Sequence, residues 1–345
     1  MKRLIFVVIF CNIFYNSLLS QVDPGDSTVI RNIWDSWNIS GAIPTGCDNN
    51  YPFQNATQWC KSAFVNGRAT FFQAGHNRVQ SGTLPSTIGN LTELTFIELR
   101  VNPNLIGAIP HELGYLTNLK TLLISGCGFT GPIPQEIGNL SNLENFQLGN
   151  PGINGTIPLT FINLNRLKSF YLVNSDVKED LPGFFGLLDS LISIVCDHNP
   201  SFGNLLSDSL CLSNSLGNIA LRGNHFYGPL PQCLGTIPTL ESLNISNSHF
   251  SGSIPQSLCN PVHPYFWLVA DSTDIDGLPL IPPTQTLEIY SLIHNKLQFG
   301  DFENNYFNGC WSCINTIAPQ DSVWSLLDTT VLINTTVILN STVTG

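Results

Sequence analysis

The stretch "NLTELTFIELRVNPNLIGAIPHELGYLTNLKTLLISGCGFTGPIPQEIG", from Asn90 to Gly138, repeats one apolar pattern almost unchanged. In each copy, spaced leucines or isoleucines are followed by glycine and then by Ile-Pro. A period of about two dozen residues is typical of a solenoid, in which each repeat packs only against its neighbours. This stretch therefore predicts the fold of most of the chain.

The same unit can be followed in both directions from this stretch. A single unit cannot bury its own leucines, whereas stacked units bury them against each other in one elongated core. The alternating Leu-x-Leu segment of each unit predicts a half-buried strand, so the stack predicts a parallel sheet. The units begin near Arg68 and at Leu91, Leu116, Leu140, Leu164, Leu188, Ser213, Ile237, Pro261 and Thr284.

A short polar residue follows the predicted strand in most units. A side-chain amide at this place can bond backbone groups of the turn and of the next unit, which satisfies buried polar groups. The position is held by Asn102, Asn199, Asn224 and Asn295, and by Cys127 and Ser175 in two other units.

These units resemble leucine-rich repeats of the plant extracellular type, whose signature includes the segment G-x-I-P. The segment "GAIPHELGYLTNLKTLLISGCGFTGPIPQEIGNLSNL", Gly107 to Leu143, matches that signature almost position by position. The resemblance covers about Arg68 to Gly300. It implies an α/β right-handed solenoid of about ten repeats of about 24 residues, curved as a horseshoe or superhelix. It also implies a parallel sheet on the concave face and a helical N-terminal cap. Such modules form the ectodomains of receptor kinases and receptor-like proteins, and also polygalacturonase inhibitors.

Three units depart from the pattern. The segment "NPSFGNLLSDSLC" (Asn199 to Cys211) lacks the Gly and Ile-Pro positions, and Glu179 stands at the Gly position of its unit. In the unit from Pro261, Asp274 and Asp276 fall at the Leu and Gly positions. These departures either loosen the far side of the repeats locally or are family variation, and we favour the second interpretation.

Residues 1–20 are expected to be a secretory signal peptide, because a basic start is followed by an apolar run and a plausible cleavage region. Without Lys2 and Arg3, 11 basic residues face 24 acidic ones, a net charge of −13. An acidic chain has no electrostatic case for binding nucleic acid or anionic lipid. Only 11% of the residues are charged, which suits a secreted, glycosylated protein. The chain contains eight Asn-x-Ser/Thr glycosylation sequons, at Asn38, Asn55, Asn90, Asn139, Asn154, Asn244, Asn334 and Asn340.

The remaining parts are expected to cap and extend the repeats. Residues 21–66 form the predicted N-terminal cap, with a helix in "STVIRNIWDSWN", and the resemblance implies a Cys47–Cys60 disulfide. Residues 67–300 form the repeats and 301–317 a C-terminal cap closed by Cys310–Cys313. Residues 318–345, rich in Thr, Val and Asn, are either the start of further β structure or a stalk.

The other cysteines have different expected roles. Nine remain after the signal peptide, an odd number, so at least one stays free. Cys127 and Cys196 are expected to be buried and unpaired. Cys233 is expected to pair with either Cys211 or Cys259, because all three lie near equivalent loop ends.

No enzyme motif stands out. The chain lacks a nucleophile elbow, a zinc-protease helix, a phosphate loop and a dinucleotide fingerprint. Asp197 and His198 follow a strand with no placed nucleophile, which favours a surface pair. The "CWSC" segment has no strand–helix frame for redox chemistry and no further ligands for zinc. We therefore expect no catalysis, no cofactor and no metal.

Binding is what the repeat geometry provides. Residues between the buried leucines point out of the sheet on strands about 4.8 Å apart, so they build a continuous ladder. Its central row is predicted to include Leu268, with Phe266 and Ala270 on its two sides. A glycan on Asn244 would obstruct the ladder. The candidate ligand-binding residues are Glu98, Arg100, Leu123, Gln147, Tyr171, Val173, Val195, Asp197, His198 and Arg222.

The sequence leaves two functions open. One is a recognition module that binds an extracellular protein, peptide or glycan on its concave sheet, with or without a co-receptor. The alternative is a structural or adhesive protein of the cell wall or matrix, in which the repeats act as scaffold. The expected location is extracellular, and a membrane span after Gly345 would place the protein at the cell surface.

Overall fold

The computed structural model describes residues 24–37, 60–66, 68–75, 79–259, 266–280 and 287–297, without the side chains of 60–64 and 287–290. Several expectations lie outside these described residues. They are the signal peptide, both terminal disulfides, the C-terminal cap, the tail, and the sequons at Asn38, Asn55, Asn334 and Asn340.

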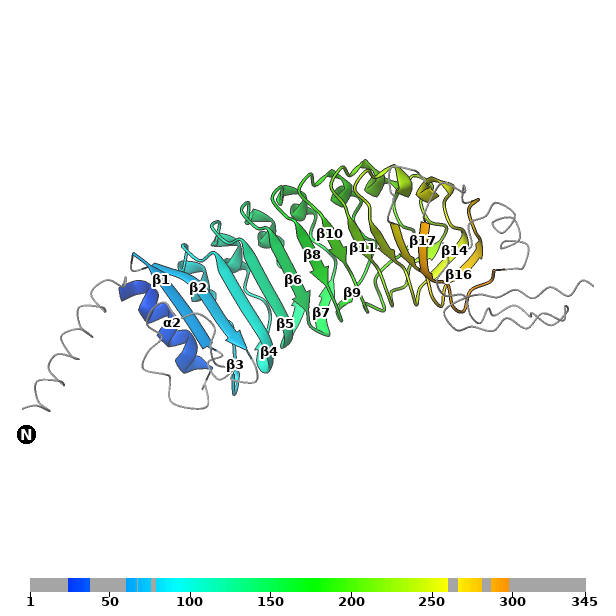
Figure 1. Cartoon of the computed structure of the whole chain (residues 1–345). Helices are drawn as coiled ribbons and strands as arrows, with labels where there is room; N and C mark the ends of the chain where they lie inside the picture. Colours follow the sequence, from blue (N-terminus) through cyan, green and yellow to red (C-terminus); the bar gives the residue numbers. More distant parts are fainter. Residues whose placement is uncertain are drawn as a thin grey trace, which may run out of the picture. The chain divides into compact units, whose positions relative to one another are not determined.

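The chain divides into two compact units. The first contains the residues up to Ile153 together with Pro158–Leu164, and the second contains Asn154–Ile157 and the residues from Asn165 onward. Each unit is a stack of repeats in which a strand, a turn and a 3-10 helix follow one another (Figure 1). No helix within the described residues is long and apolar enough to cross a membrane.

The first unit begins with an antiparallel strand pair and continues as a parallel sheet. Strand β1 runs antiparallel to β2, and β2, β4, β5 and β6 then pair in parallel and in register. The elements of this unit are α2 (Pro24–Ser36), β1 (Cys60–Val65), β2 (Arg68–Gly75), β3 (Gly82–Thr83), η1 (Ser86–Asn90), β4 (Phe96–Gly107), η2 (His111–Tyr115), β5 (Thr121–Pro132), η3 (Gln135–Asn139), β6 (Asn145–Gly149) and η4 (Leu159–Asn163). Strand β7 (Gly152–Gly155) contains residues of both units.

The second unit has one long parallel sheet and a second row of shorter strands. The long sheet consists of β8 (Ser169–Leu172), β10 (Ser193–Val195), β11 (Asn218–Ala220), β13 (Ser242–Asn244), β15 (Phe266–Val269) and β17 (Leu287–Ser291). The shorter strands are β9 (Asp176–Val177), β12 (Tyr227–Gly228), β14 (His249–Ser253) and β16 (Asp274–Gly277). The helices are η5 (Gly183–Leu187), η6 (Asp208–Leu212), η7 (Leu234–Thr236) and η8 (Gln256–Cys259).

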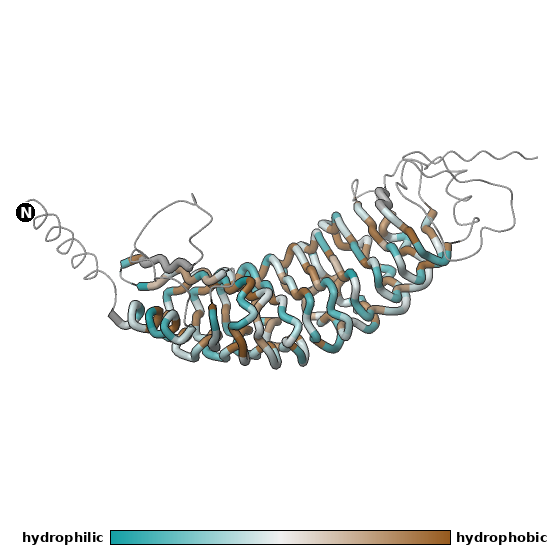
Figure 2. The backbone as a smooth tube through the Cα atoms, turned by 90° about the horizontal axis from the view of Figure 1, so that it is seen from below, coloured by the Kyte–Doolittle hydropathy of each residue, from teal (hydrophilic) through white to brown (hydrophobic). Residues whose placement is uncertain are grey.

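The core of each unit follows the alternation predicted from the sequence. In β5, Leu122 and Ile124 are buried, whereas Leu123 and Ser125 are only half-buried. Hydrophobic and hydrophilic residues accordingly alternate along the backbone of the strands (Figure 2). Burial of apolar surface is the main favourable term in such a stack. The structure confirms the predicted leucine-rich-repeat solenoid with a parallel sheet.

The N-terminal helix packs on the first repeat through aromatic side chains. Trp34 and Trp37 lie with their ring centroids 5.5 and 5.9 Å from that of Phe72. The indole Nε1 of Trp37 donates a hydrogen bond to the carbonyl of Thr83 at 2.8 Å. The buried Asp26 carboxylate accepts a hydrogen bond from the Ala69 amide at 2.8 Å. The helix predicted within the N-terminal cap is therefore present, and it covers the apolar end of the stack.

The polar position after each strand forms a buried ladder of hydrogen bonds. Asn102 accepts a hydrogen bond from the Val79 amide at 3.2 Å and donates to the Ala74 carbonyl at 3.1 Å. The sequence analysis missed Asn150, which is also fully buried and accepts a hydrogen bond from the Cys127 amide at 2.6 Å. The ladder comprises Asn102, Cys127, Asn150, Ser175, Asn199, Asn224, Ser248, Thr273 and Asn295.

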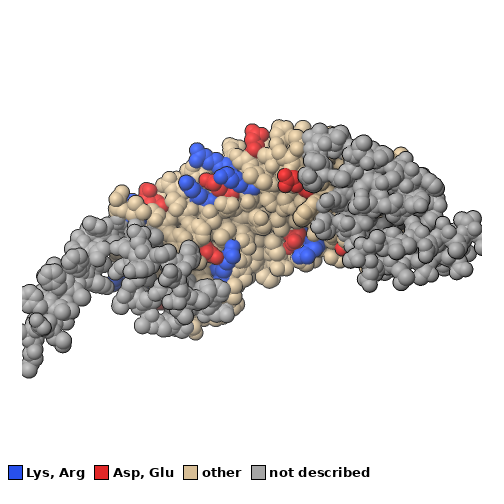
Figure 3. All heavy atoms as spheres, in the orientation of Figure 1, with Lys and Arg blue, Asp and Glu red and all other residues tan. Residues whose placement is uncertain are grey.

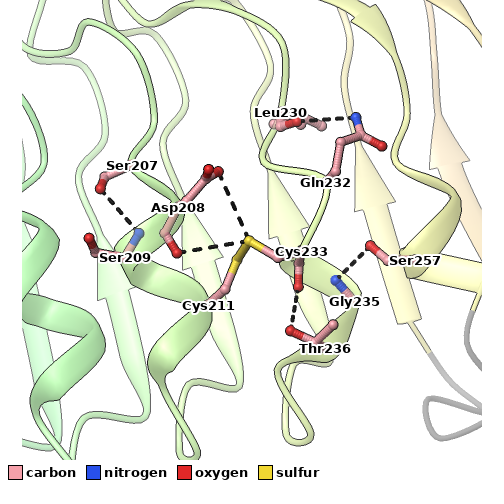
Figure 4. Close-up of a disulfide and its surroundings, with 10 residues drawn as sticks. All are labelled: Ser207, Asp208, Ser209, Cys211, Leu230, Gln232, Cys233, Gly235, Thr236 and Ser257. Carbon is pink, nitrogen blue, oxygen red and sulfur yellow. Dashed lines mark hydrogen bonds between the residues drawn. A yellow bond between two sulfur atoms is a disulfide. The ribbon is translucent and has the colours of Figure 1, made fainter.

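The structure shows which cysteine pairs with Cys233. Cys211 and Cys233 form a disulfide between two consecutive repeats, beside Asp208 (Figure 4). Cys259 is free and buried, as are Cys127 and Cys196, which confirms the expectation for the latter two. Burial raises the pKa of Cys127 and of Cys259 to about 11. Burial, and then the charge of Asp197, raises the pKa of Cys196 well above its usual value. These thiols are therefore packing groups rather than nucleophiles.

In the repeat that was predicted to start at Pro261, the predicted register is wrong by one residue. Leu268 pairs with Leu243 and is buried, as are Phe266 and Ala270, so none of the three faces outward. Leu243 and Leu268 are 25 residues apart, whereas the prediction assumed a spacing of 24 between these units. A slip of one residue moves every side chain of a strand to the opposite face.

The same slip misplaced the two aspartates of that unit. Ile275, one residue after the predicted leucine position, is fully buried, while Asp274 is only half-buried and Asp276 is exposed. The pairing of β14 with β16 shifts after Gly252, which leaves Asp276 without a partner residue in the register. An unpaired extra residue of this kind is a β-bulge.

Glu179 adopts a backbone conformation that favours glycine. Its φ is +83°, close to the +80° of Gly155 and the +77° of Gly228 at the corresponding places. A side chain in this region costs of the order of 1–3 kcal/mol.

We expect Glu179→Gly to raise the free energy of unfolding by about 1 kcal/mol, because it removes this strain at the expense of chain entropy. Urea unfolding followed by circular dichroism would measure the change. Glu179→Ala is the matched control, since alanine keeps the strain and removes only the carboxylate. An equal gain in both variants would show that charge, and not backbone strain, is the cause.

Candidate ligand-binding face

The outward face of the first unit's sheet carries a polar network. Gln73, Glu98, Leu123 and Gln147 lie in register on four neighbouring strands. The Gln73 amide donates a hydrogen bond to Glu98 Oε2 at 2.9 Å, and Arg100 Nη2 donates to Gln147 Oε1 at 3.0 Å. Four of the predicted binding residues, Glu98, Arg100, Leu123 and Gln147, therefore belong to one cluster.

Within this cluster the positive charge of Arg100 is balanced by the carboxylate of Glu98. Arg100 Nε lies 3.0 Å from Glu98 Oε1 as an ion pair, although its orientation does not make a hydrogen bond. Beside them, the rings of Phe71 and Phe96 stack with centroids 4.5 Å apart. The network holds its side chains in place without a ligand, which favours a rigid surface over a vacant charged site.

The outward face of the second unit is more apolar. Tyr171, Val195 and Ala220 lie in register on β8, β10 and β11, and all are half-buried. Asn244 and Val269 continue this row on β13 and β15. The row forms a continuous strip in which side chains of adjacent strands are neighbours.

Charged groups lie at the strand ends beside this strip. Asp197 Oδ1 accepts a hydrogen bond from the Arg222 amide at 3.0 Å, and Asp197 Oδ2 lies 3.7 Å from Arg222 Nη2. His198 is exposed and has a φ of +57°, while Val173 is half-buried at the equivalent end of β8. The second unit therefore holds the other six predicted residues, with Asp197 engaged by Arg222 rather than by His198.

The sequence analysis missed Trp267. The residue lies on β15 in register with Ser242 on β13, and 49% of it is exposed. Its row also contains Ser169, Ser193 and Asn218, so a large aromatic side chain follows a line of small polar ones. The alternation of Phe266, Trp267 and Leu268 could have revealed it if the repeat spacing had been counted as 25.

The described sequons differ in their surroundings. Asn90 and Asn139 end η1 and η3 and are exposed, and Asn154 is exposed on β7. Asn244 is half-buried on the sheet, and its Oδ1 accepts a hydrogen bond from the Ser246 amide at 3.1 Å. Glycosylation of all four stays a prediction.

The described part of the chain has few charged side chains on its surface. Lysine, arginine and acidic side chains appear singly or in small groups of mixed charge on a largely uncharged surface (Figure 3). Among the described residues, no group of three His, Cys, Asp or Glu side chains could hold a metal ion.

A family comparison identifies the repeat. The model of the leucine-rich repeat matches residues 118–140 and 239–261, one match in each unit. These two stretches are leucine-rich repeats, and the fold of the chain is a leucine-rich-repeat solenoid. Its best-matched repeats carry the Gly and Ile-Pro positions of the plant extracellular type.

Solved structures share the fold of this chain. A plant ice-binding protein is 19% identical, with a TM-score of 0.57, over 74% of this chain and 89% of its own. A TDR receptor is 28% identical, with a TM-score of 0.53, over 63% of this chain and 42% of its own. The plant peptide hormone receptor RGFR1, solved in complex with RGF2, is 25% identical, with a TM-score of 0.51, over 65% and 40%. The chain thus spans less than half the length of either receptor structure.

Proposed function

We propose that this leucine-rich-repeat protein is an extracellular, non-catalytic recognition module that binds a peptide or protein on the outward sheet face of its second unit. The observation that carries the proposal is the apolar row Tyr171, Val195 and Ala220, with the exposed Trp267 two strands further along the sheet. Tyrosine and tryptophan are enriched among the residues that dominate binding energy at protein interfaces.

Four further observations support this proposal. The structure of a plant peptide hormone receptor resembles this fold. The Cys211–Cys233 disulfide suits an oxidising compartment, as does the predicted signal peptide. The polar groups of the face, such as Asn218 and Ser193 at 3.0 Å, bond across strands and can also bond an extended chain. Asp197 and Arg222 add charge at one end of the strip.

The proposal can be tested with peptides selected from a random library against the secreted chain. We expect the affinity of a selected peptide, measured by calorimetry, to fall at least tenfold in Tyr171→Ala and in Trp267→Ala. A tenfold loss corresponds to about 1.4 kcal/mol, a usual cost for truncating an interface aromatic.

Tyr115→Ala is the matched control. Tyr115 ends η2 in the first unit and is 54% exposed, so it is an aromatic residue of similar exposure away from the proposed face. Its replacement should change the affinity less than twofold. Peptides that respond to Tyr115→Ala, or to none of the three substitutions, would contradict the proposed face.

A further inference from the structure

The second unit contains a pocket that the proposed function does not use. It has a volume of about 400 Å³ and lies where the chain leaves β13, β15 and β17. Strands β14 and β16 pair with each other, and β17 pairs with β15 (Figure 1). Small-molecule pockets usually measure about 300–1,000 Å³ and contain a few convergent polar groups.

Three consecutive repeats present one polar side chain each at its rim. Asn247, Ser272 and His294 occupy the same place in the turn, with φ values of +54°, +52° and +55°. The amides of Asn247 and Ser272 donate to carbonyls of the following repeat, at 2.8 and 2.7 Å. Because these backbone groups are engaged, a ligand would meet the exposed side chains instead.

The polar side chains at the floor of the pocket already have hydrogen-bond partners within the protein. The buried hydroxyl of Ser248 donates to the Leu221 carbonyl at 3.3 Å, and the Thr273 hydroxyl lies 3.2 Å from the Ala270 carbonyl. These two residues belong to the ladder that joins the repeats. Recognition is therefore assigned to the rim, where His249 and Asp274 lie beside Ser272.

The charges around the pocket balance. Asp274 Oδ1 lies 2.7 Å from Lys296 Nζ, and Asp274 Oδ2 lies 4.0 Å from His249 Nδ1. The ring centroids of His225 and His249 lie 5.7 Å apart. Because the Asp274 carboxylate is paired with the Lys296 ammonium group, it offers a cation little net attraction. The rim instead offers carboxylate acceptors, an amide, a hydroxyl and imidazoles, which can both donate and accept.

We propose that this pocket binds a neutral saccharide. Sugar hydroxyls both donate and accept hydrogen bonds, so they complement the mixed groups of Asn247, Ser272, Asp274 and His294. The imidazole of His249 adds a flat ring face against which the C–H side of a sugar can pack. The site lies beyond the strand ends and is independent of the proposed peptide-binding face.

Saturation-transfer NMR on the secreted full chain tests the proposal with cellobiose, mannobiose, galactobiose and xylobiose. We expect a transfer signal from at least one of these neutral disaccharides. That signal should fall at least fivefold in Asp274→Asn and in His249→Ala. Both side chains are more than one-third exposed, so neither variant should unfold the unit. Thermal unfolding would verify this.

Matched controls and an anionic probe make the result decisive. Asp189→Asn and His111→Ala replace exposed side chains elsewhere and should leave the signal unchanged. Digalacturonic acid should give no signal that depends on the pocket. The proposal is overturned if no neutral disaccharide gives a signal, if only digalacturonic acid responds at the pocket, or if the signal survives both pocket variants.

Discussion

Asn199→Ala is expected to lower the free energy of unfolding of the second unit by about 3 kcal/mol, because two buried backbone groups lose their partners. Asn199 is fully buried. It donates to the Leu172 carbonyl at 2.8 Å and accepts from the Ser175 amide at 2.9 Å. Each group that stays buried without a partner costs about 1–3 kcal/mol. The alanine variant also leaves a small void between two repeats.

Urea unfolding of the full chain, followed by circular dichroism, would measure this loss. Asn204→Ala is the control, because Asn204 is exposed and lies in the same repeat. It should change the stability by less than about 0.5 kcal/mol. If the two variants were equally stable, the buried amide would not be essential to the stack.

Gly235→Ala should have an effect of similar size through a steric clash. An added Cβ at Gly235 would lie 1.9 Å from the carbonyl oxygen of Ser257 and 2.1 Å from its carbonyl carbon. Both atoms belong to the backbone of the next repeat, so a side-chain rotation cannot relieve the contact. Overpacking of this kind costs about 3 kcal/mol when the backbone has to move.

Gly217→Ala is the matched control for this substitution. A Cβ at Gly217 would meet the Thr239 carbonyl oxygen at 3.3 Å, and its next contact would be at 3.7 Å. We expect a loss of less than about 1 kcal/mol for this variant. Thermal unfolding of both proteins would compare them. Equal midpoints would show that η7 and η8 can separate without cost.

Much of the fold could be predicted from the sequence because the same apolar pattern recurs in many repeats. The Ile-Pro turn, the alternating strand and the position of Asn199 each occur in several units, so a local departure does not hide the pattern. Where a unit departs, the prediction fails locally. The spacing of 25 residues between Leu243 and Leu268 reversed the faces of β15 and hid Trp267.

The site was only partly predictable for a different reason. The sequence placed Glu98, Arg100 and Gln147 on one face, since alternation fixes which side chains point outward. It did not reveal that Arg100 on β4 reaches past β5 to Gln147 on β6, because the partner of a long side chain depends on the three-dimensional arrangement. The choice of Cys211 over Cys259 as the partner of Cys233 likewise depends on which loops adjoin in space.

The buried ladder gives the stack a direction. The amide of Asn199 donates to Asn224 Oδ1, which belongs to the following repeat, at 2.9 Å. The side chain of Asn224 in turn donates back to the carbonyl of Cys196. The amides of Val79, Cys127 and Ser175 likewise donate to the asparagine of the following repeat, so each of these repeats is completed by its successor. Deletion of a whole repeat can join two compatible ends and preserve these bonds, whereas truncation after one of these repeats removes the partner of its amide. Gain and loss of complete repeats is therefore the route by which such a protein can change its length.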